Sequence, residues 1–335
     1  MVRRSHWLLL LAALLSLAAC SAAAAPLAGR LRPGVVVAAA VHNDTSTPFN
    51  LVSMPALIRH EYDGRGLEIG RLLAAELSSD RYHVTYRSGS LTISGQLTVP
   101  RRTGRFPLVV LAHGYEAPAT YRSGAALSRE QAYLAARGYV VLLTDYRSYG
   151  DSDRDSAQPE AARLGYPEDL VNAVLAVRRA HLPFVDGSRV GVLGRSMGGG
   201  VALQAVAARP RLFGALVLYA PVSSLASDNY ERWVAGTGDL DARVLSTYGA
   251  PQDNARFWRQ ASVRSYLRRV DVPVQVHHGL ADAVCPVAWS RATVQALRRA
   301  GQSVEYFEYP GEGHRFDEAW PTMARRIADF LDDNV

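Results

Sequence analysis

Short apolar runs that alternate with helical segments constrain the fold of this chain more than any other feature. The runs are nearly continuous and of strand length, as in strands that are buried on both faces of a sheet. They occupy 108–112, 139–144, 190–193, 215–219, 272–276 and 303–309. Segments with helical periodicity occupy 124–137, 160–180, 197–208, 286–300 and 318–331. This order predicts an α/β fold, with helices covering both faces of a mostly parallel sheet.

Three further segments lie outside that alternation. Residues 83–99 alternate polar and β-prone side chains around a Ser-Gly pair, which predicts an antiparallel hairpin. Residues 62–79 have apolar side chains at helical spacing, so we expect a helix there. Residues 221–267 separate two predicted strands and are expected to form a small helical cap. Its aromatic side chains can pack the cap onto the body or line a substrate pocket: Tyr230, Trp233, Tyr248, Phe257 and Trp258.

The N-terminus has the layout of an export signal. Arg3 and Arg4 precede an apolar run that ends in small residues, and the sequence LAAC at 17–20 resembles a bacterial lipobox. We therefore expect residues 1–19 to be a lipoprotein signal peptide and Cys20 to carry a lipid that anchors the exported protein in the cell envelope. Cleavage after 22–24 and free secretion is the alternative. Residues 20–48 are predicted to be a flexible tether, and 49–335 the folded domain.

Composition excludes several classes of function. The 37 Lys+Arg residues are all arginine, so a phosphate-binding Gly-Lys loop, a Schiff base and a Ser-Lys dyad are ruled out. The net charge of +6 is not gathered in a basic run, and we expect no nucleic acid partner. If Cys20 carries lipid, Cys285 is the only other cysteine and no internal disulfide can form. The sequence leaves the oligomeric state open.

The stretch GVLGRSMGGG at 191–200 could hold either a phosphate or a nucleophile. Its glycines do not have the Gly-x-Gly-x-x-Gly spacing of a dinucleotide-binding turn. Residues 194–198 instead match Gly-x-Ser-x-Gly, a sharp strand-to-helix turn that presents a serine above the sheet. We therefore predict that Ser196 is a nucleophile. Arg195 has no evident role and is expected to point into solvent.

Two further catalytic candidates follow predicted strands in the order required. Asp282 lies beyond the strand at 272–276, and His314 lies beyond the strand at 303–309. The order Ser196, Asp282, His314 is that of a hydrolase triad. In this triad His314 takes the proton of Ser196, and Asp282 orients His314 and stabilises its charged form. Activity is then expected to rise with pH as His314 loses its proton.

A tetrahedral intermediate also needs two hydrogen-bond donors for its oxyanion. The backbone amide of Met197, at the start of a predicted helix, is the first candidate. The second is Tyr115, through its amide or its hydroxyl, in the loop after the strand at 108–112.

The other histidines and the second cysteine are predicted to be structural. His113 is expected to brace its loop, and His277 and His278 to fill space at a strand end, because adjacent side chains of a strand point to opposite faces. Cys285 is expected to be a buried small hydrophobe. The sequence predicts no metal and no cofactor.

Four motifs together carry a resemblance to a known family. They are LAHG (111–114), GRSMGG (194–199), HGLADAV (278–284) and GEGH (311–314). From about residue 83 to 331 the chain resembles the serine hydrolases of the prolyl oligopeptidase type and their dienelactone-hydrolase and acyl-esterase relatives. The resemblance implies an α/β-hydrolase fold with a mostly parallel eight-stranded sheet, and acyl transfer to water through an acyl-enzyme.

The chain also departs from that family in two places. The region before residue 83 is too short for the β-propeller of the large oligopeptidases, and the loop at 113–115 reads His-Gly-Tyr instead of the frequent His-Gly-Gly. We therefore expect a serine hydrolase that cleaves a small carboxylic ester or a short-peptide amide. The alternatives are a non-catalytic binding lipoprotein with a hydrolase fold and an acyltransferase that uses the same triad.

Overall fold

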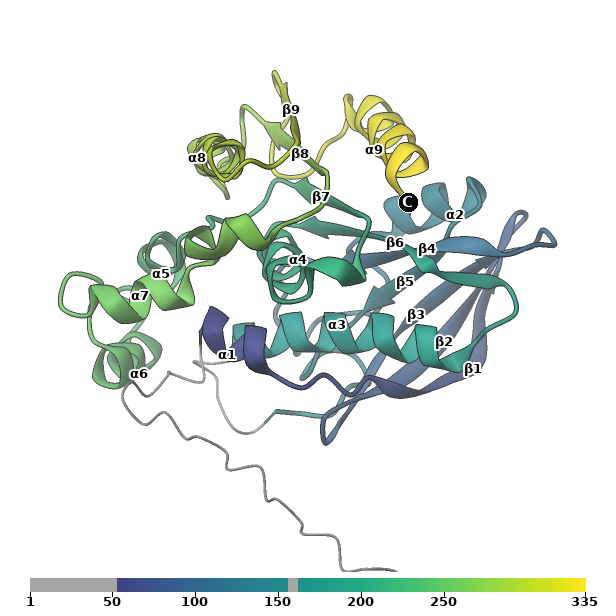
Figure 1. Cartoon of the computed structure of the whole chain (residues 1–335), viewed down its shortest axis with the longest axis horizontal. Coiled ribbons are helices and arrows are strands. Elements are labelled where there is room, and N and C mark those ends of the chain that lie inside the picture. The colour runs from purple at the N-terminus through teal and green to yellow at the C-terminus, as the bar shows by residue number, and fades with distance from the viewer. Residues whose placement is uncertain (1–52, 156–161) are drawn as a thin grey trace, which may run out of the picture. The chain divides into compact units, whose positions relative to one another are not determined.

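The computed structural model describes residues 53–155 and 162–335 (Figure 1). The predicted signal peptide at 1–19, the lipidation site Cys20 and the tether at 20–48 lie outside the described residues. None of the described helices is both long enough and apolar enough to cross a membrane.

In this part of the chain nine strands form a single sheet in the order β1-β2-β3-β5-β4-β6-β7-β8-β9. The pairs β1–β2, β2–β3 and β3–β5 are antiparallel, and all later pairs are parallel. The strands are β1 (Arg65–Ala75), β2 (Ser79–Ser88), β3 (Leu91–Pro100), β4 (Phe106–Ala112), β5 (Val140–Thr144), β6 (Val185–Arg195), β7 (Ala215–Tyr219), β8 (Val274–Gly279) and β9 (Val304–Tyr309).

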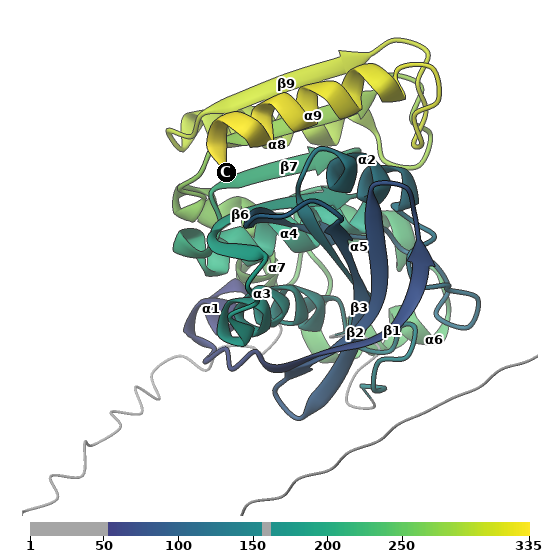
Figure 2. The ribbon, with the colours of Figure 1, turned by 90° about the vertical axis from the view of Figure 1, so that its right-hand side faces the viewer.

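Helices cover both faces of the sheet (Figures 1 and 2). Helices α3, α4 and α8 pack on one face, and α2 and α9 pack on the other. The helices are α1 (Met54–Arg59), α2 (Ser128–Ala136), α3 (Ala162–Ala180), α4 (Met197–Ala208), α5 (Ala226–Trp233), α6 (Asp239–Tyr248), α7 (Ala255–Ala261), α8 (Val287–Arg299) and α9 (Trp320–Asn334), with the 3-10 helices η1 (Pro210–Leu212) and η2 (Val263–Arg269). The prediction of a mostly parallel α/β sheet with two covered faces is confirmed.

The continuous apolar runs exist because each central strand supplies two cores. In β4, Leu108 and Val110 belong to the core under α3 and α4, whereas Val109 and Leu111 belong to the core under α2 and α9. All four side chains are fully buried. Successive side chains of a strand point to opposite faces, so both sets of positions must be apolar.

The segment at 62–79 was predicted to be helical, and this prediction is wrong. It contains β1, which pairs with β2 at the edge of the sheet and makes the sheet nine-stranded instead of eight-stranded. The register of β1 shifts at three places, including the step from Ile69 to Leu72. Such bulges break the two-residue alternation of a strand, and the apolar spacing then imitates that of a helix.

Residues 221–267, the expected cap, contain α5, α6, α7 and η2. These helices enclose a small apolar cluster of their own that includes Tyr230, Val244, Tyr248, Phe257 and Trp258. The rings of Tyr248 and Phe257 stack with their centroids 4.4 Å apart. In Figure 1 the three cap helices group together beside α4. Four of the five aromatic residues noted in the sequence belong to this cluster.

His277, in β8, makes the stability of the fold depend on pH. Its ring is fully buried, with Nδ1 2.8 Å from the Tyr309 hydroxyl and Nε2 2.8 Å from Gln275 Oε1. Burial, with a contribution from the charge of Arg326, lowers the pKa of His277 to about 3. The unfolded chain has an ordinary histidine pKa of about 6.5. Between these two values only the unfolded chain binds the proton, so the free energy of unfolding falls as the pH falls.

We predict that His277→Phe flattens this pH dependence. The contribution of His277 to the loss is about 1.4 kcal/mol per pH unit within that window. The variant should lose less stability than the wild type between about pH 6.5 and pH 5, even if it is less stable at neutral pH. Urea unfolding of both proteins across this range provides the measurement. Parallel curves for the two proteins would contradict a neutral, buried His277.

Candidate active site

A strained turn joins β6 to α4. Ser196 lies between the last residue of β6 and the first residue of α4, with φ 58° and ψ −123°. A residue with a side chain pays about 1–3 kcal/mol for such a backbone conformation. Hydrogen bonds hold the turn, since the Ser196 amide donates to the Tyr219 carbonyl at 3.0 Å and the Ser196 carbonyl accepts from the Gly199 amide at 2.9 Å.

The glycines on either side of Ser196 are required by close backbone contacts. A Cβ atom on Gly194 would lie 2.2 Å from the Gly198 carbonyl oxygen, and one on Gly198 would lie 2.0 Å from the Ala112 carbonyl oxygen. Neither position can hold a side chain without moving the backbone. Only glycine fits at these two positions, and this requirement is visible in the sequence as the Gly-x-Ser-x-Gly pattern.

The loops after β8 and β9 bring Asp282 and His314 together. Nδ1 of His314 lies 2.8 Å from Oδ2 of Asp282. The other carboxylate oxygen, Oδ1, accepts hydrogen bonds from the amides of Val284 and Cys285 at 2.8 and 2.9 Å. The Asp282 side chain is fully buried, whereas the His314 side chain keeps 18% of its surface exposed. Hydrogen bonds therefore hold both oxygens of the Asp282 carboxylate, and the ring of His314 remains accessible.

A second histidine, His278, contacts the same carboxylate. Its Nε2 lies 3.3 Å from Asp282 Oδ2 and 2.9 Å from the Cys285 carbonyl oxygen, and its Nδ1 lies 2.6 Å from the Ser290 hydroxyl. From the sequence, His278 is expected only to fill space at a strand end, so this contact is not predicted. The four-residue spacing from His278 to Asp282 across a glycine turn is the signal that was available.

These contacts decide the charge of Asp282. Burial by itself would raise its pKa, but hydrogen bonds from His278, His314 and the Cys285 amide outweigh burial, and the pKa of Asp282 lies well below its usual range. Asp282 is thus ionised at neutral pH. Cys285 is fully buried beside Ser196 and Asp282, and burial, reinforced by the Asp282 charge, raises the pKa of its thiol to about 12. The thiol stays protonated, as expected for a buried hydrophobe.

The loop after β4 crosses directly over Ser196. A Cβ atom on Gly114 would lie 3.2 Å from Ser196 Cβ and 3.7 Å from Ser196 Oγ. Tyr115 follows in the same loop and is 61% exposed, whereas His113 is fully buried with its ring nitrogens 2.7 Å from the Gly114 carbonyl oxygen and 3.1 Å from the Asp145 carbonyl oxygen. His113 therefore braces this loop, as predicted. Gly114 thus lies against Ser196, and Tyr115 is the next residue of the same loop.

The family of the chain follows from its sequence pattern together with this geometry. Residues 125–335 match the pattern of the prolyl oligopeptidase family, a peptidase family that is designated S9. The chain belongs to the prolyl oligopeptidase family. It is a serine hydrolase with the α/β-hydrolase fold.

Relatives of this family member are named as peptidases, thioesterases and esterases. It is 30% identical over 222 residues to an acylamino-acid-releasing enzyme of Arabidopsis thaliana, covering 63% of this chain and 28% of that one. It is 28% identical over 193 residues to acyl-coenzyme A thioesterase 1 of Rattus norvegicus, covering 56% and 41%. The chain spans less than half the length of these relatives.

Solved structures support the fold over most of the chain. An acetyl xylan esterase from Paenibacillus sp. R4 aligns with a TM-score of 0.65 at 20% identity and covers 84% of this chain and 92% of that one. A putative dipeptidyl aminopeptidase IV from Bacteroides ovatus aligns with a TM-score of 0.62 at 19% identity, covering 77% and 36%.

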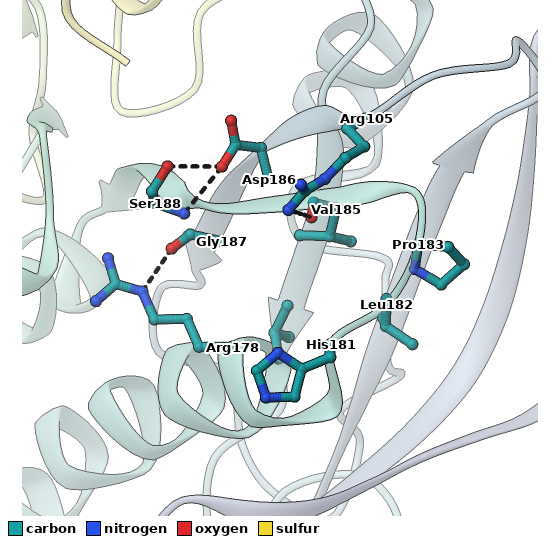
Figure 3. A pocket seen from close by; sticks show the side chains of 10 residues that line it. Arg105, Arg178, His181, Leu182, Pro183, Val185, Asp186, Gly187 and Ser188 are labelled. Atoms are coloured by element: carbon teal, nitrogen blue, oxygen red, sulfur yellow. Dashed lines mark hydrogen bonds between the residues drawn. The ribbon is translucent and has the colours of Figure 1, made fainter.

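A separate hollow lies at the opposite end of β6 from Ser196 (Figure 3). It is lined by the end of α3 and the start of β6, and two of its polar side chains, Arg105 and Arg178, donate hydrogen bonds to the backbone carbonyls of Val185 and Gly187. These arginines brace the chain around the hollow. In parallel sheets ligands bind at the carboxyl ends of strands, and this hollow lies at the amino end.

Arg195 does not point into solvent, so that prediction is wrong. It is only 7% exposed, and among the described residues its Nε has no hydrogen-bond partner. It is the last residue of β6, and the side chain points to the face where α2 and the chain around Phe316 cover the sheet. Burial lowers the pKa of Arg195. The charges of Glu130 and Glu116 offset part of the desolvation of this guanidinium, but burial outweighs them, and no carboxylate of the described residues forms an ion pair with it.

We predict that Arg195→Met raises the free energy of unfolding by about 1–3 kcal/mol, because methionine fills a similar volume without a charge. Denaturant unfolding at neutral pH provides the measurement. Arg195→Ala is the matched control, since it removes the same charge but leaves a cavity and should stabilise less. If Arg195→Met is less stable than the wild type, the prediction is contradicted. The guanidinium would then make a stabilising interaction that is absent from the described part of the structure.

Proposed function

We propose that this serine hydrolase cleaves a small carboxylic ester or a short-peptide amide through an acyl-enzyme on Ser196, with His314 as general base and Asp282 as its partner. The observation that carries the proposal is the 2.8 Å contact between His314 Nδ1 and the buried Asp282 carboxylate. Both residues lie on loops that follow strands of the sheet, and β6 of the same sheet ends at Arg195, directly before Ser196. The three residues stand in the hydrolase order along the chain.

The charges of the site suit this role. An ionised Asp282 accepts the Nδ1 hydrogen of His314, which leaves Nε2 of the neutral ring as the proton acceptor. When the His314 ring takes a proton, the negative charge of Asp282 stabilises the resulting positive charge. His278 is a positioning residue in this scheme, because its Nε2 contacts the same carboxylate oxygen from the other side.

The reaction has two halves. Oγ of Ser196 attacks the substrate carbonyl carbon while its proton passes to His314, and the amides of Met197 and Tyr115 donate hydrogen bonds to the oxyanion. When the intermediate collapses, His314 gives the proton to the leaving alcohol or amine and the acyl group remains on Ser196. Water then attacks the acyl-enzyme by the same route and releases the acid.

Names of relatives support both substrate types. The acylamino-acid-releasing enzymes and the putative dipeptidyl aminopeptidase point to amides, and the acetyl xylan esterases and thioesterases point to esters and thioesters. The oxyanion site and the triad serve either bond, because both reactions pass through the same tetrahedral intermediate.

We predict that Ser196→Ala and His314→Gln each lower kcat by about 10⁶, and that Asp282→Asn lowers it by about 10⁴. The loss is smaller for Asp282→Asn because Ser196 and His314 remain in place. Steady-state kinetics with p-nitrophenyl acyl esters and with aminoacyl and prolyl amides provide the measurement. Leu77→Ala, whose side chain is 99% exposed in the turn between β1 and β2, is a control that keeps all three groups. Retained turnover in folded Ser196→Ala would contradict the proposal.

We also propose that the protein is exported and anchored in the cell envelope through lipid on Cys20. Support comes from the sequence alone, in which the arginines, the apolar run and LAAC at 17–20 stand in the order of a lipoprotein signal.

We predict that Cys20→Ala releases the protein from the membrane fraction of the expressing cells, because the lipid is then lost. Fractionation and immunoblotting provide the measurement, with Ser21→Ala as the matched control that keeps the anchor. If Cys20→Ala is retained in the membrane as well as Ser21→Ala, anchoring through Cys20 is contradicted.

A further inference from the structure

A cavity of about 560 Å³ lies between α4 and the cap and begins next to the nucleophile. Its wall includes Met197, the residue directly after Ser196, and Tyr115 from the loop that crosses Ser196. One face of α4 forms a continuous part of the wall, through Met197, Gly200, Val201 and Gln204. These positions extend about 10 Å along the helix axis. The cavity therefore extends from the vicinity of Ser196 along this face of α4.

The cap closes this space with apolar and aromatic side chains. Tyr230, Val244, Tyr248, Phe257 and Trp258 line it, and each is at most 9% exposed. They come from α5, α6 and α7 and pack into the cluster that holds the cap helices together. The wall is thus part of a packed core and is already formed without a ligand.

The described residues that line the cavity offer no partner for a charged group. Although the chain contains 37 arginines and no lysine, none of the described residues that line the cavity is cationic. Asp155 is the only acid among them, and its carboxylate already lies 3.2 Å from the guanidinium of Arg147. An ammonium or carboxylate that entered would lose its hydration without gaining an opposite charge.

Three of the polar side chains in the wall, Ser223, Ser224 and Asn229, already have hydrogen-bond partners in the protein. Both amide atoms of Asn229 bond to the backbone of Ser223, and the Ser223 hydroxyl donates to Asp228. The Ser224 hydroxyl is shared with Thr293 and Arg264. These groups hold α5 to the body, so the chemistry that the cavity presents to a substrate is predominantly apolar.

We propose that this cavity binds the acyl part of the substrate, and that the preferred acyl group is uncharged, apolar and of medium length. The inference rests on the proposed acyl-enzyme at Ser196 and adds the chemical class of the acid. An acetyl group would leave most of the space empty. A medium-length chain would bury its methylenes against the α4 face and the aromatic cap.

Hydrolysis of p-nitrophenyl acetate, hexanoate and 6-aminohexanoate by the wild-type protein tests the proposal. Each methylene that enters the cavity should raise kcat/KM by about fourfold, so hexanoate should exceed acetate by at least about tenfold. The aminohexanoate ester has the same length but ends in an ammonium group, and its kcat/KM should be about a hundredfold lower than that of hexanoate.

A matched pair of variants in α6 ties the preference to the cavity. Leu240 lines the cavity, whereas Leu245 on the same helix is 37% exposed and does not line it. Leu240→Arg should lower the ratio of hexanoate to acetate by about tenfold or more. Leu245→Arg should leave that ratio within about twofold of the wild type. If Leu240→Arg fails to fold, Ala261→Phe, which fills the cavity with an apolar ring, should lower the ratio in the same way.

The outcomes separate this inference from the proposed function. Hydrolysis of acetate at least as fast as hexanoate, or equal rates for hexanoate and aminohexanoate, would overturn the acyl preference and leave the acyl-enzyme mechanism standing. If Leu240→Arg and Leu245→Arg change the ratio of hexanoate to acetate equally, the acyl group does not bind in this cavity and the proposed location is wrong. Failure of the wild type to hydrolyse any of the three esters would count against the proposed function itself.

Discussion

The backbone of Ser196 is held in a conformation that a residue with a side chain adopts only under constraint, and the rest of the site depends on that constraint. β6 pairs with β4 and β7 on its two sides, and α4 begins immediately after the serine. The glycine positions at 194 and 198 let strand and helix approach closely enough to close the turn. The strain of about 1–3 kcal/mol is thus offset by the packing of the central sheet.

The other two groups of the proposed triad depend on the same sheet. Asp282 follows β8 and His314 follows β9, and both strands run parallel to β6, so their carboxyl ends lie at one edge of the sheet. Each loop is then fixed by local contacts: the amides of Val284 and Cys285 hold Asp282, and Asp282 holds His314. The sheet brings the groups together, and hydrogen bonds in the loops fix their orientation.

Much of the fold could be predicted from the sequence, because strands buried on both faces must be apolar at every position. The six strands from β4 to β9 and the segments that contain Ser196, Asp282 and His314 follow from this rule together with the turn chemistry, whereas β2 and β3 follow from the alternation of polar and β-prone residues at 83–99. The edge strand β1 did not, because its bulges break the alternation that marks a strand. The burial of Arg195 and the contact of His278 with Asp282 were missed for another reason. Both depend on which loop lies over a strand end, and a single sequence carries little information on that point.

Labelling with a fluorophosphonate probe tests the central claim most directly, because the probe reacts only with a serine that is activated by its neighbours. We predict that the folded wild-type protein gains one adduct, that peptide mass mapping places it on Ser196, and that His314→Gln greatly slows its formation. An active, folded protein that gains no adduct, or that carries the adduct on another residue, would contradict the assignment of Ser196 as the nucleophile.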